Sequence, residues 1–228
     1  LFPSLKDKMT VIYNAKNPGI IRRKAAATTG DDRIDRPYLL AVERLEESQK
    51  DLTTLLEAYA LLRKTFYREE WLYIIGKGSS EEELKQKARA LGIAGRTVFL
   101  GFCPNPYPWM LRSRLLVHSA KFEGLPTVLI EGLLLNKLMV ATDCPTGPRE
   151  ILDDGRAGLL VPVGDAAAFA SATDCLLNDT QLQADILQGV RDRAADFTFQ
   201  AVDSKLRELM GIRLSTDGNR RSSTTFNR

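Results

Sequence analysis

Residues 115–131 read Leu115-Leu116-Val117-His118-Ser119-Ala120-Lys121-Phe122-Glu123-Gly124-Leu125-Pro126-Thr127-Val128-Leu129-Ile130-Glu131. The apolar run at Leu115–Val117 predicts a buried strand, and the residues from Pro126 to Leu135 predict a helix. Proline suits the first helical position, because its fixed φ fits a helix and its missing N–H would have no partner there. Between the strand and the helix, Gly124 allows the backbone to turn tightly and to approach a ligand closely.

The start of this predicted helix has the properties of an anion site. The free amides of Thr127 and Val128 would point out of the helix, where the helix dipole favours a negative group such as phosphate. Glu131 lies one turn further along the same face as Thr127, and Glu123 lies in the preceding loop. Two carboxylates therefore flank a place suited to an anion, with Leu125 in the turn between them.

Strands and helices alternate along the chain. Continuous apolar runs predict strands at Tyr38–Val42, Trp71–Ile75, Val98–Leu100, Leu115–Val117, Met139–Ala141 and Leu159–Val161. Helical spacing predicts further helices at Lys50–Lys64, Ser80–Leu91, Asp165–Leu177, Thr180–Phe197 and Phe199–Met210. Ser80 and Glu83 form a predicted capping box, and Met9–Asn14 is expected to be one more short strand. The alternation predicts an α/β fold with a doubly wound parallel sheet, whose ligands bind beyond the carboxyl ends of the strands.

The composition is that of an ordinary globular protein. The 228 residues are 44% hydrophobic and 27% charged, enough for one large or two small domains. A net charge of +3, without interleaved basic and aromatic residues, gives no support for nucleic acid as a partner. Three widely spaced cysteines fit a reducing compartment, and neither a membrane-spanning run nor a signal-peptide pattern is visible.

A family resemblance enters at two blocks of residues. Glu123 and Glu131, eight positions apart around Gly-Leu-Pro-Thr, resemble the signature of retaining GT-B glycosyltransferases of group 1 (family 4), which use nucleotide-sugar donors. The run Ala141–Leu152 resembles the next block of that family, and the likeness extends from Thr10 to Met210. It implies that the chain is the Rossmann-like C-terminal, donor-binding domain of a GT-B fold, and that the N-terminal acceptor domain is missing from it.

The resemblance also implies roles for particular residues. Arg44 and Lys50, six apart after the Tyr38–Val42 strand, match the family's basic pair on the donor phosphates, although a solvated helix start is the alternative. Glu131 is then expected to bind the ribose hydroxyls, and Glu123 the donor sugar. The alternatives are an ordinary exposed helix residue for Glu131 and a helix-dipole partner for Glu123. Phe102 follows a strand where the family cradles the edge of the base, largely with its main chain.

Arg44, Lys50 and Glu123 are therefore the predicted catalytic residues, and Glu131, Gly124, Leu125, Thr127, Val128 and Phe102 the predicted donor-binding residues. No two aspartates are separated by one residue, as metal-using transferases often have, so no metal or other cofactor is expected.

Two positions depart from the family pattern. Glu43 stands where glycine commonly precedes the arginine, and its carboxylate is a candidate partner for Arg44 that would weaken the grip on phosphate. His118 stands where the family commonly has an apolar or small residue, and it is expected to be a buried histidine with satisfied hydrogen bonds. Asn136–Met139 also replaces the usual Gly-x-Pro turn.

Three regions are expected along the chain. Residues 1–36 would be an interdomain linker remnant and a basic loop, residues 37–212 the donor domain, and residues 213–228 a disordered tail. We interpret the segment from Lys16 to Arg36 as a solvated loop in preference to a membrane or lipid-phosphate patch around Arg22–Lys24.

The expected activity is transfer of a sugar, with retention, from a UDP-sugar to a glycan or lipid-linked acceptor in bacterial polysaccharide biosynthesis. The expected location is the cytoplasm, with peripheral contact at the inner membrane face left open. Two alternatives also remain open. The chain is either a truncated or split-enzyme module that binds donor without activity alone, or a GT-B epimerase acting on UDP-sugars.

Overall fold

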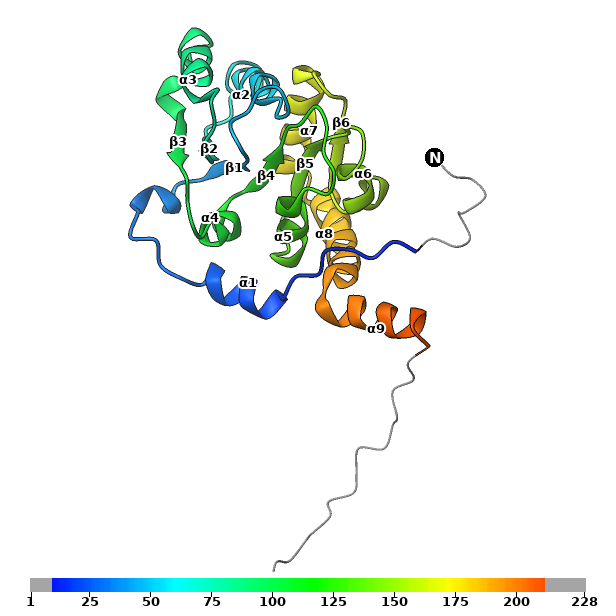
Figure 1. Ribbon diagram of the computed structural model, residues 1–228. Coiled ribbons are helices and arrows are strands. Elements are labelled where there is room, and N and C mark those ends of the chain that lie inside the picture. Colours follow the sequence, from blue (N-terminus) through cyan, green and yellow to red (C-terminus); the bar gives the residue numbers. More distant parts are fainter. Residues whose placement is uncertain (1–9, 212–228) are drawn as a thin grey trace, which may run out of the picture.

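A single parallel sheet of six strands organises the computed structural model, which describes residues 10–211 (Figure 1). The strands lie in the order β3-β2-β1-β4-β5-β6. Their bounds are β1 Tyr38–Val42, β2 Trp71–Ile75, β3 Thr97–Gly101, β4 Leu115–His118, β5 Met139–Thr142 and β6 Leu159–Val161. All five pairings are parallel, which confirms the predicted doubly wound α/β fold.

The two strands at the centre of the sheet are buried on both faces, as their uninterrupted apolar sequences predict. Four of the five residues of β1 are buried, and so are all four of β4. β1 pairs with β2 over its whole length, from Tyr38 opposite Trp71 to Val42 opposite Ile75. On its other side β1 pairs with β4 through Leu39 and Leu40.

Helices cover both faces of the sheet (Figure 1). The helices are α1 Pro18–Ala25, α2 Leu52–Thr65, α3 Glu81–Ala90, α4 Tyr107–Arg112, α5 Thr127–Leu134, α6 Pro148–Ile151, α7 Ala166–Asn178, α8 Thr180–Ala194 and α9 Phe199–Leu209. α2 packs against α3 and α7 on one face, and α4 and α5 cover the other face, where α1 packs against both. Every helix expected from Lys50 to Met210 is present, with bounds shifted by a few residues.

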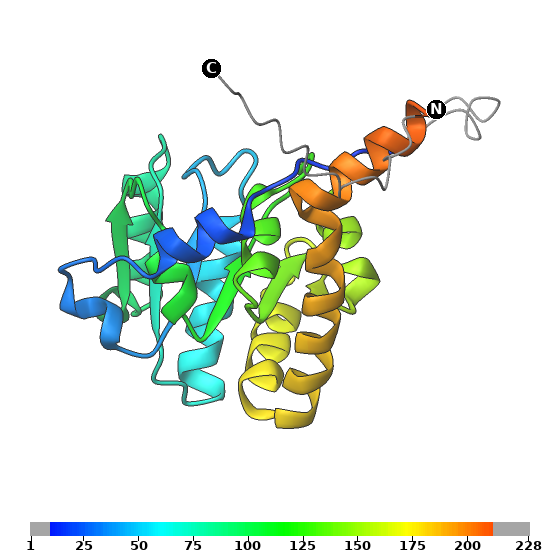
Figure 2. The same cartoon turned by 90° about the horizontal axis from the view of Figure 1, so that it is seen from below.

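The segment before α1 corrects the expectation of a strand at Met9–Asn14. Residues 10–15 belong to no strand, and Met9 lies outside the described residues. Lys16 alone forms a bridge, with its N–H donating to the carbonyl of Phe197 at 2.8 Å. Figure 2 shows this dark blue segment running beside the corner between α8 and α9. A side chain also holds the segment, since the Tyr13 hydroxyl donates to Glu150 Oε1 at 2.9 Å.

The basic segment from Lys16 to Arg36, expected to be a loop, contains α1. The Asn17 side chain caps the helix by accepting from the N–H of Ile20 at 3.1 Å, and proline opens the first turn. Ile21 and Ala25 are buried, so one face of α1 is fixed to the domain. An Asn-Pro pair before helically spaced apolar residues is a helix-start signal, and the abundance of charge obscured it.

Two expected helix starts also differ from the structure. α5 begins at Thr127, and Pro126 is its N-cap residue with extended backbone angles rather than the first helical residue. Ser80 makes no capping-box hydrogen bond, because its hydroxyl accepts instead from the N–H of Glu47 at 3.0 Å. The predicted disordered tail, residues 213–228, lies outside the described residues.

Two backbone loops beyond the carboxyl ends of β1 and β2 lie in direct contact. The N–H of Glu43 donates to the carbonyl of Ile75 at 2.9 Å, and the N–H of Leu45 donates to that of Lys77 at 3.0 Å. A Cβ at Gly78 would lie 2.1 Å from the Leu45 carbonyl oxygen, so this approach requires glycine. The loop that carries Arg44 is therefore fixed by its main chain.

We expect Gly78→Ala to lower the free energy of unfolding by about 1–3 kcal/mol, because the new methyl group overlaps backbone that cannot move aside cheaply. Gly95→Ala is the matched control, since a Cβ there meets no atom within 4 Å. Urea unfolding of both variants measures the difference. Equal stability of the two would contradict the close approach of the loops.

Candidate functional site

The strand order reverses between β1 and β4, and a hollow opens at that point. The loop after β1 leads toward β2 on one side, and the loop after β4 leads toward β5 on the other, so the two loops diverge above the sheet. The hollow has a volume of about 250 Å³. Its lining residues are Val42, Glu43, Arg44, Gln49, Lys50, Glu123, Leu125, Pro126, Thr127 and Val128. All three predicted catalytic residues and three of the predicted donor-binding residues therefore line one site.

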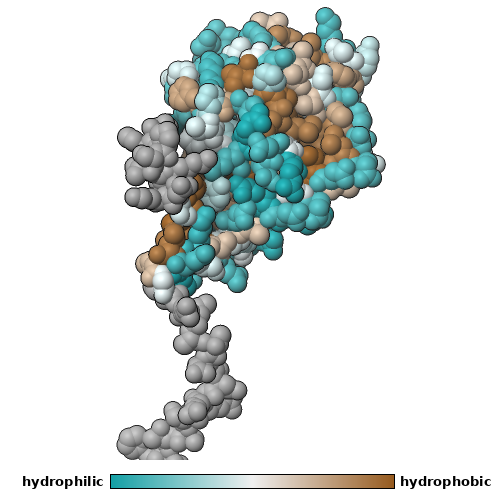
Figure 3. Space-filling model, turned by 90° about the vertical axis from the view of Figure 1, so that its right-hand side faces the viewer, coloured by the Kyte–Doolittle hydropathy of each residue, from teal (hydrophilic) through white to brown (hydrophobic). Residues whose placement is uncertain are grey.

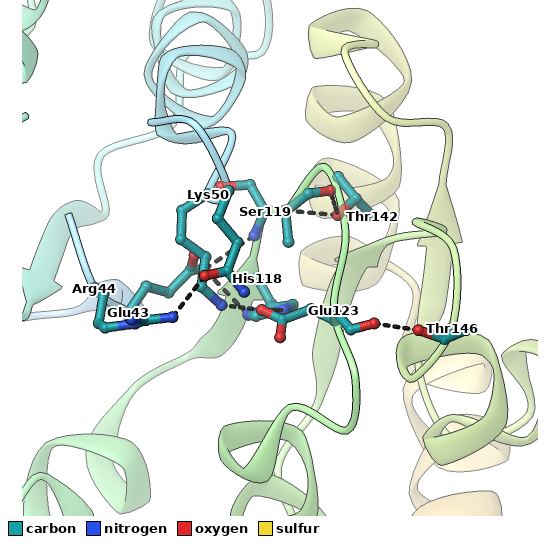
Figure 4. Close-up of polar contacts among 10 residues, drawn as sticks. Glu43, Arg44, Lys50, His118, Ser119, Glu123, Thr142 and Thr146 are labelled. Atoms are coloured by element: carbon teal, nitrogen blue, oxygen red, sulfur yellow. Dashed lines mark hydrogen bonds and ion pairs between the residues drawn. The ribbon is translucent and has the colours of Figure 1, made fainter. Parts of the chain in front are cut away.

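Lys50 and Glu123 form a buried ion pair across the hollow (Figure 4). Both side chains are only 9% exposed, and the lysine ammonium donates a hydrogen bond to the glutamate. Burial alone would raise the pKa of Glu123, but the neighbouring His118 ring and the hydrogen-bonded Lys50 ammonium lower it to about 2. Glu123 is therefore a carboxylate at neutral pH.

Arg44 projects into the same hollow from the rim. Its Nη2 donates to Gln49 Oε1 at 2.6 Å, and its side chain is exposed. Glu43, the candidate partner of Arg44, does not pair with it, because the Glu43 carboxylate turns into the protein and accepts from the N–H of Ser119. Among residues 10–211 no carboxylate forms an ion pair with Arg44, which leaves the guanidinium available to an anion.

His118 lies beneath the hollow, between two carboxylates (Figure 4). Its Nδ1 is 3.2 Å from Glu43 Oε1, and its Nε2 is 3.5 Å from Glu123 Oε1. Burial by itself would lower the pKa of His118, but the charge of Glu43 and the Glu123 carboxylate raise it above the ordinary value. Glu43 Oε1 also accepts from the N–H of Ser119 at 3.0 Å.

The expectation of a buried histidine is confirmed, since His118 is 1% exposed. The expectation of satisfied hydrogen bonds is wrong. Neither ring nitrogen has a well-aligned hydrogen-bond partner among the described residues, and Glu43 Oε2 has none either. The ring therefore lies between two carboxylates without a hydrogen bond to either of them.

The start of α5 forms one wall of the hollow. Thr127 and Val128 line it, no acidic residue occupies the first turn, and Pro126 offers no side-chain cap to the first amides. The positive end of the helix dipole consequently lacks a negative partner from its own sequence. Together with Arg44 and Lys50, this helix end makes the hollow suited to an anion with several oxygens.

The loop that carries Glu123 is supported by the Ala141–Leu152 block. The Thr146 hydroxyl donates to the Glu123 carbonyl. Gly147 has a φ of 80°, and a Cβ on it would lie 2.7 Å from the Gly124 carbonyl oxygen. Arg149 forms ion pairs with Asp143 and Asp154 rather than pointing into the hollow at Glu123. The Ala141–Leu152 block thus supports the main chain of the loop that carries Glu123 without lining the hollow itself.

Three predicted residues, Gly124, Glu131 and Phe102, are not among those that line the hollow. Glu131 accepts from Lys16 Nζ at 3.2 Å and from the Tyr107 hydroxyl at 3.1 Å, and burial followed by the Glu131 charge raises the pKa of Tyr107 to about 12. Phe102 is 65% exposed and lines a separate hollow of about 410 Å³ at the β3 edge. Sequence reasoning did not foresee Lys16 or Tyr107 as neighbours of Glu131, because each comes from a distant segment.

None of the helices in the described part of the chain is long and apolar enough to cross a membrane. Residues 10–211 also contain no group of three or more His, Cys, Asp or Glu side chains placed to hold a metal ion.

Comparison with known proteins points to one family. The family model described as "Glycosyl transferases group 1" matches residues 36–179. An N-acetylgalactosaminyltransferase of Campylobacter jejuni, which acts on a diphospho-undecaprenol-linked sugar by its name, is 30% identical over 83% of this chain and 50% of its own length. A lipopolysaccharide core biosynthesis glycosyltransferase of Rhizobium meliloti is 28% identical over 90% of this chain and 58% of its own. The chain thus spans about half the length of these relatives.

Solved structures share the fold. The Anabaena protein HepE, determined with UDP and glucose, superposes with a TM-score of 0.76 at 21% identity, over 89% of this chain and 56% of that one. The apo form of the lipopolysaccharide outer core galactosyltransferase WaaB gives 0.69 at 24% identity, over 91% and 57%.

We expect Glu123→Gln to lower the free energy of unfolding by about 3 kcal/mol at pH 7, because it leaves buried cations without their partner. A carboxylate with a depressed pKa stabilises the fold above its unfolded value of 4.5, and this contribution is lost as pH falls through about 2. The difference in the free energy of unfolding between the unaltered chain and the variant should therefore shrink steadily below pH 4.5. Urea unfolding followed by circular dichroism across this range measures it, and a deficit independent of pH would contradict the ion pair.

Proposed function

The chain belongs to the group 1 glycosyl transferases, and from this premise we propose that it is the donor-binding half of an enzyme that transfers a sugar from a nucleotide-diphospho-sugar to a glycan or lipid-linked acceptor. One observation carries the proposal. Arg44, Lys50, Glu123 and the free start of α5 line one hollow at the switch point of the sheet.

The proposed chemistry depends on the leaving group. When the sugar departs, negative charge develops on the nucleotide diphosphate and must be neutralised. The Arg44 guanidinium matches two phosphate oxygens, Lys50 supplies a second charge, and the amides of Thr127 and Val128 supply oriented dipoles. We propose that these groups, rather than a metal ion, stabilise the departing diphosphate.

UDP is the proposed nucleotide, and retention the proposed stereochemical outcome. Structures of HepE contain UDP and glucose or UDP-glucose. Because HepE shares its fold with this chain, they support UDP as the nucleotide. Glu131 would bind the ribose after exchanging its contacts with Lys16 and Tyr107, and Glu123 would bind the sugar hydroxyls from its place beside the hollow. Phe102 would lie near the base.

The remaining part of the enzyme has a candidate place on this domain. α9 has no buried residue, although apolar side chains gather along it near the end of the described chain (Figure 3). Phe199, Leu209 and Met210 are each more than half exposed, as is Val11 of the adjoining segment. We propose that an acceptor-binding half packs here, and that the enzyme works in the cytoplasm at the membrane face, in polysaccharide or lipopolysaccharide biosynthesis.

Isothermal titration with UDP tests the diphosphate site. We expect Arg44→Met and Lys50→Met each to weaken UDP binding about tenfold, because a hydrogen bond between ionised groups is lost. Lys85→Met is the control, since Lys85 pairs with Glu81 on α3 and does not line the hollow. UDP affinity that is unchanged in both site variants would contradict the proposal.

A second test concerns the exposed face of α9. We expect Leu209→Lys to change the free energy of unfolding by less than about 0.5 kcal/mol, because that residue is 52% exposed and has little packing to lose among the described residues. It should also reduce the binding of a dye that reports exposed apolar surface. Val190→Lys in α8, where the side chain is fully buried, is the contrast that should unfold the protein. A loss of stability at Leu209 comparable to that at Val190 would show that the face is already covered.

A further inference from the structure

The chain has a single histidine, and it is buried under the proposed donor site. Four ionisable side chains meet there, from the loops that follow β1 and β4 and from the last residue of β4 itself. Glu43 follows β1, Lys50 precedes α2, His118 ends β4 and Glu123 precedes α5 (Figure 4). The proposed chemistry uses Lys50 and Glu123, but it assigns no role to Glu43 and His118.

The charges of this cluster balance only when His118 carries a proton. Two carboxylates, Glu43 and Glu123, then face two cations, Lys50 and His118. The nearby Cys144 thiol adds no charge, because burial raises its pKa to about 11. Although burial opposes it, the charge of Glu43 raises the pKa of His118, which favours the imidazolium.

Lys50 has two competing anionic partners in the proposed reaction. In the structure it is bound to Glu123, whose side chain is 9% exposed. To bind the donor it must turn to the diphosphate, yet a buried carboxylate left without a cation is strongly unfavourable. A second cation against Glu123 removes this conflict, and His118, which does not line the hollow, has its Nε2 3.5 Å from the carboxylate oxygen that Lys50 also binds.

We propose that His118 is a positioning residue of the donor site: as an imidazolium held by Glu43, it neutralises Glu123 so that Lys50 is free to bind the donor diphosphate. The proposal rests on the proposed function, because it concerns how the same hollow binds a nucleotide. Glu43 is part of the device, since without its charge a fully buried imidazolium would lose its proton.

A double-mutant cycle read by UDP titration separates this role from simple packing. We expect His118→Asn to weaken UDP binding about tenfold at pH 6, because Lys50 is then retained by Glu123. Glu123→Gln should bind UDP at least as tightly as the unaltered chain, because Lys50 then has no ion pair with a carboxylate that competes with the diphosphate. The variant carrying both changes should recover the affinity of Glu123→Gln. Ser119→Ala, a buried neighbouring change that alters no charge, should leave binding unchanged.

The pH dependence gives a readout that a packing role would not move. Affinity of the unaltered chain for UDP should fall as pH rises through the pKa of His118, and His118→Asn should lack this step. Protonation of the UDP phosphate also changes the affinity with pH, but it does so equally for the unaltered chain and for His118→Asn. Because there is one histidine, its ring resonances in an NMR titration report that pKa directly, and Glu43→Gln should shift the midpoint downward.

Each outcome decides between the two proposals. UDP binding that is equal in the unaltered chain and in His118→Asn, or a loss that Glu123→Gln does not restore, overturns the role of His118 and leaves the proposed function standing. A histidine midpoint at or below the ordinary value of about 6.5 also overturns it. Absence of UDP binding by the unaltered, folded chain overturns the proposed function and the inference with it.

Discussion

The Lys50–Glu123 ion pair joins the two halves of the sheet at the place where the chain changes direction. Lys50 belongs to the loop that leads to β2, and Glu123 belongs to the loop that leads to β5. Since β1 and β4 lie side by side, these loops leave neighbouring strand ends in opposite directions and leave a hollow between them. The pair spans that hollow, so its charges are held apart from water by the fold itself.

The rest of the site is arranged around the cost of burying these charges. Glu123 accepts from Lys50 and faces His118, and His118 in turn faces Glu43. The main chain also contributes, because the N–H of Ser119 donates to Glu43 and the hydroxyl of Thr146 donates to the Glu123 carbonyl. A buried network of this kind is costly when one member is removed, which fixes the geometry of its carboxylates.

The supporting backbone is as specific as the charges. Gly78 and Gly147 lie where a Cβ would overlap the carbonyl oxygen of a neighbouring loop, so the loops that carry Arg44 and Glu123 are each held against a second one. Rigid loops of this kind keep cations and helix amides in place before an anion arrives. The Arg44 side chain is held less firmly than its loop, since it is exposed and bound only to Gln49 within the described chain.

The sequence by itself determined the order of strands and helices, because buried parallel strands and amphipathic helices leave distinct apolar patterns. The resemblance of the sequence to a known family also implied that Arg44, Lys50 and Glu123 share one donor site, and in the structure they line one hollow. Only the tertiary structure decided their partners. Glu43 and His118 are 75 positions apart and became neighbours through the pairing of β1 with β4, and Glu43 accordingly turned away from Arg44. Local patterns carry no information about such contacts, because the direction of a buried charged side chain depends on the charges that other segments bring to it.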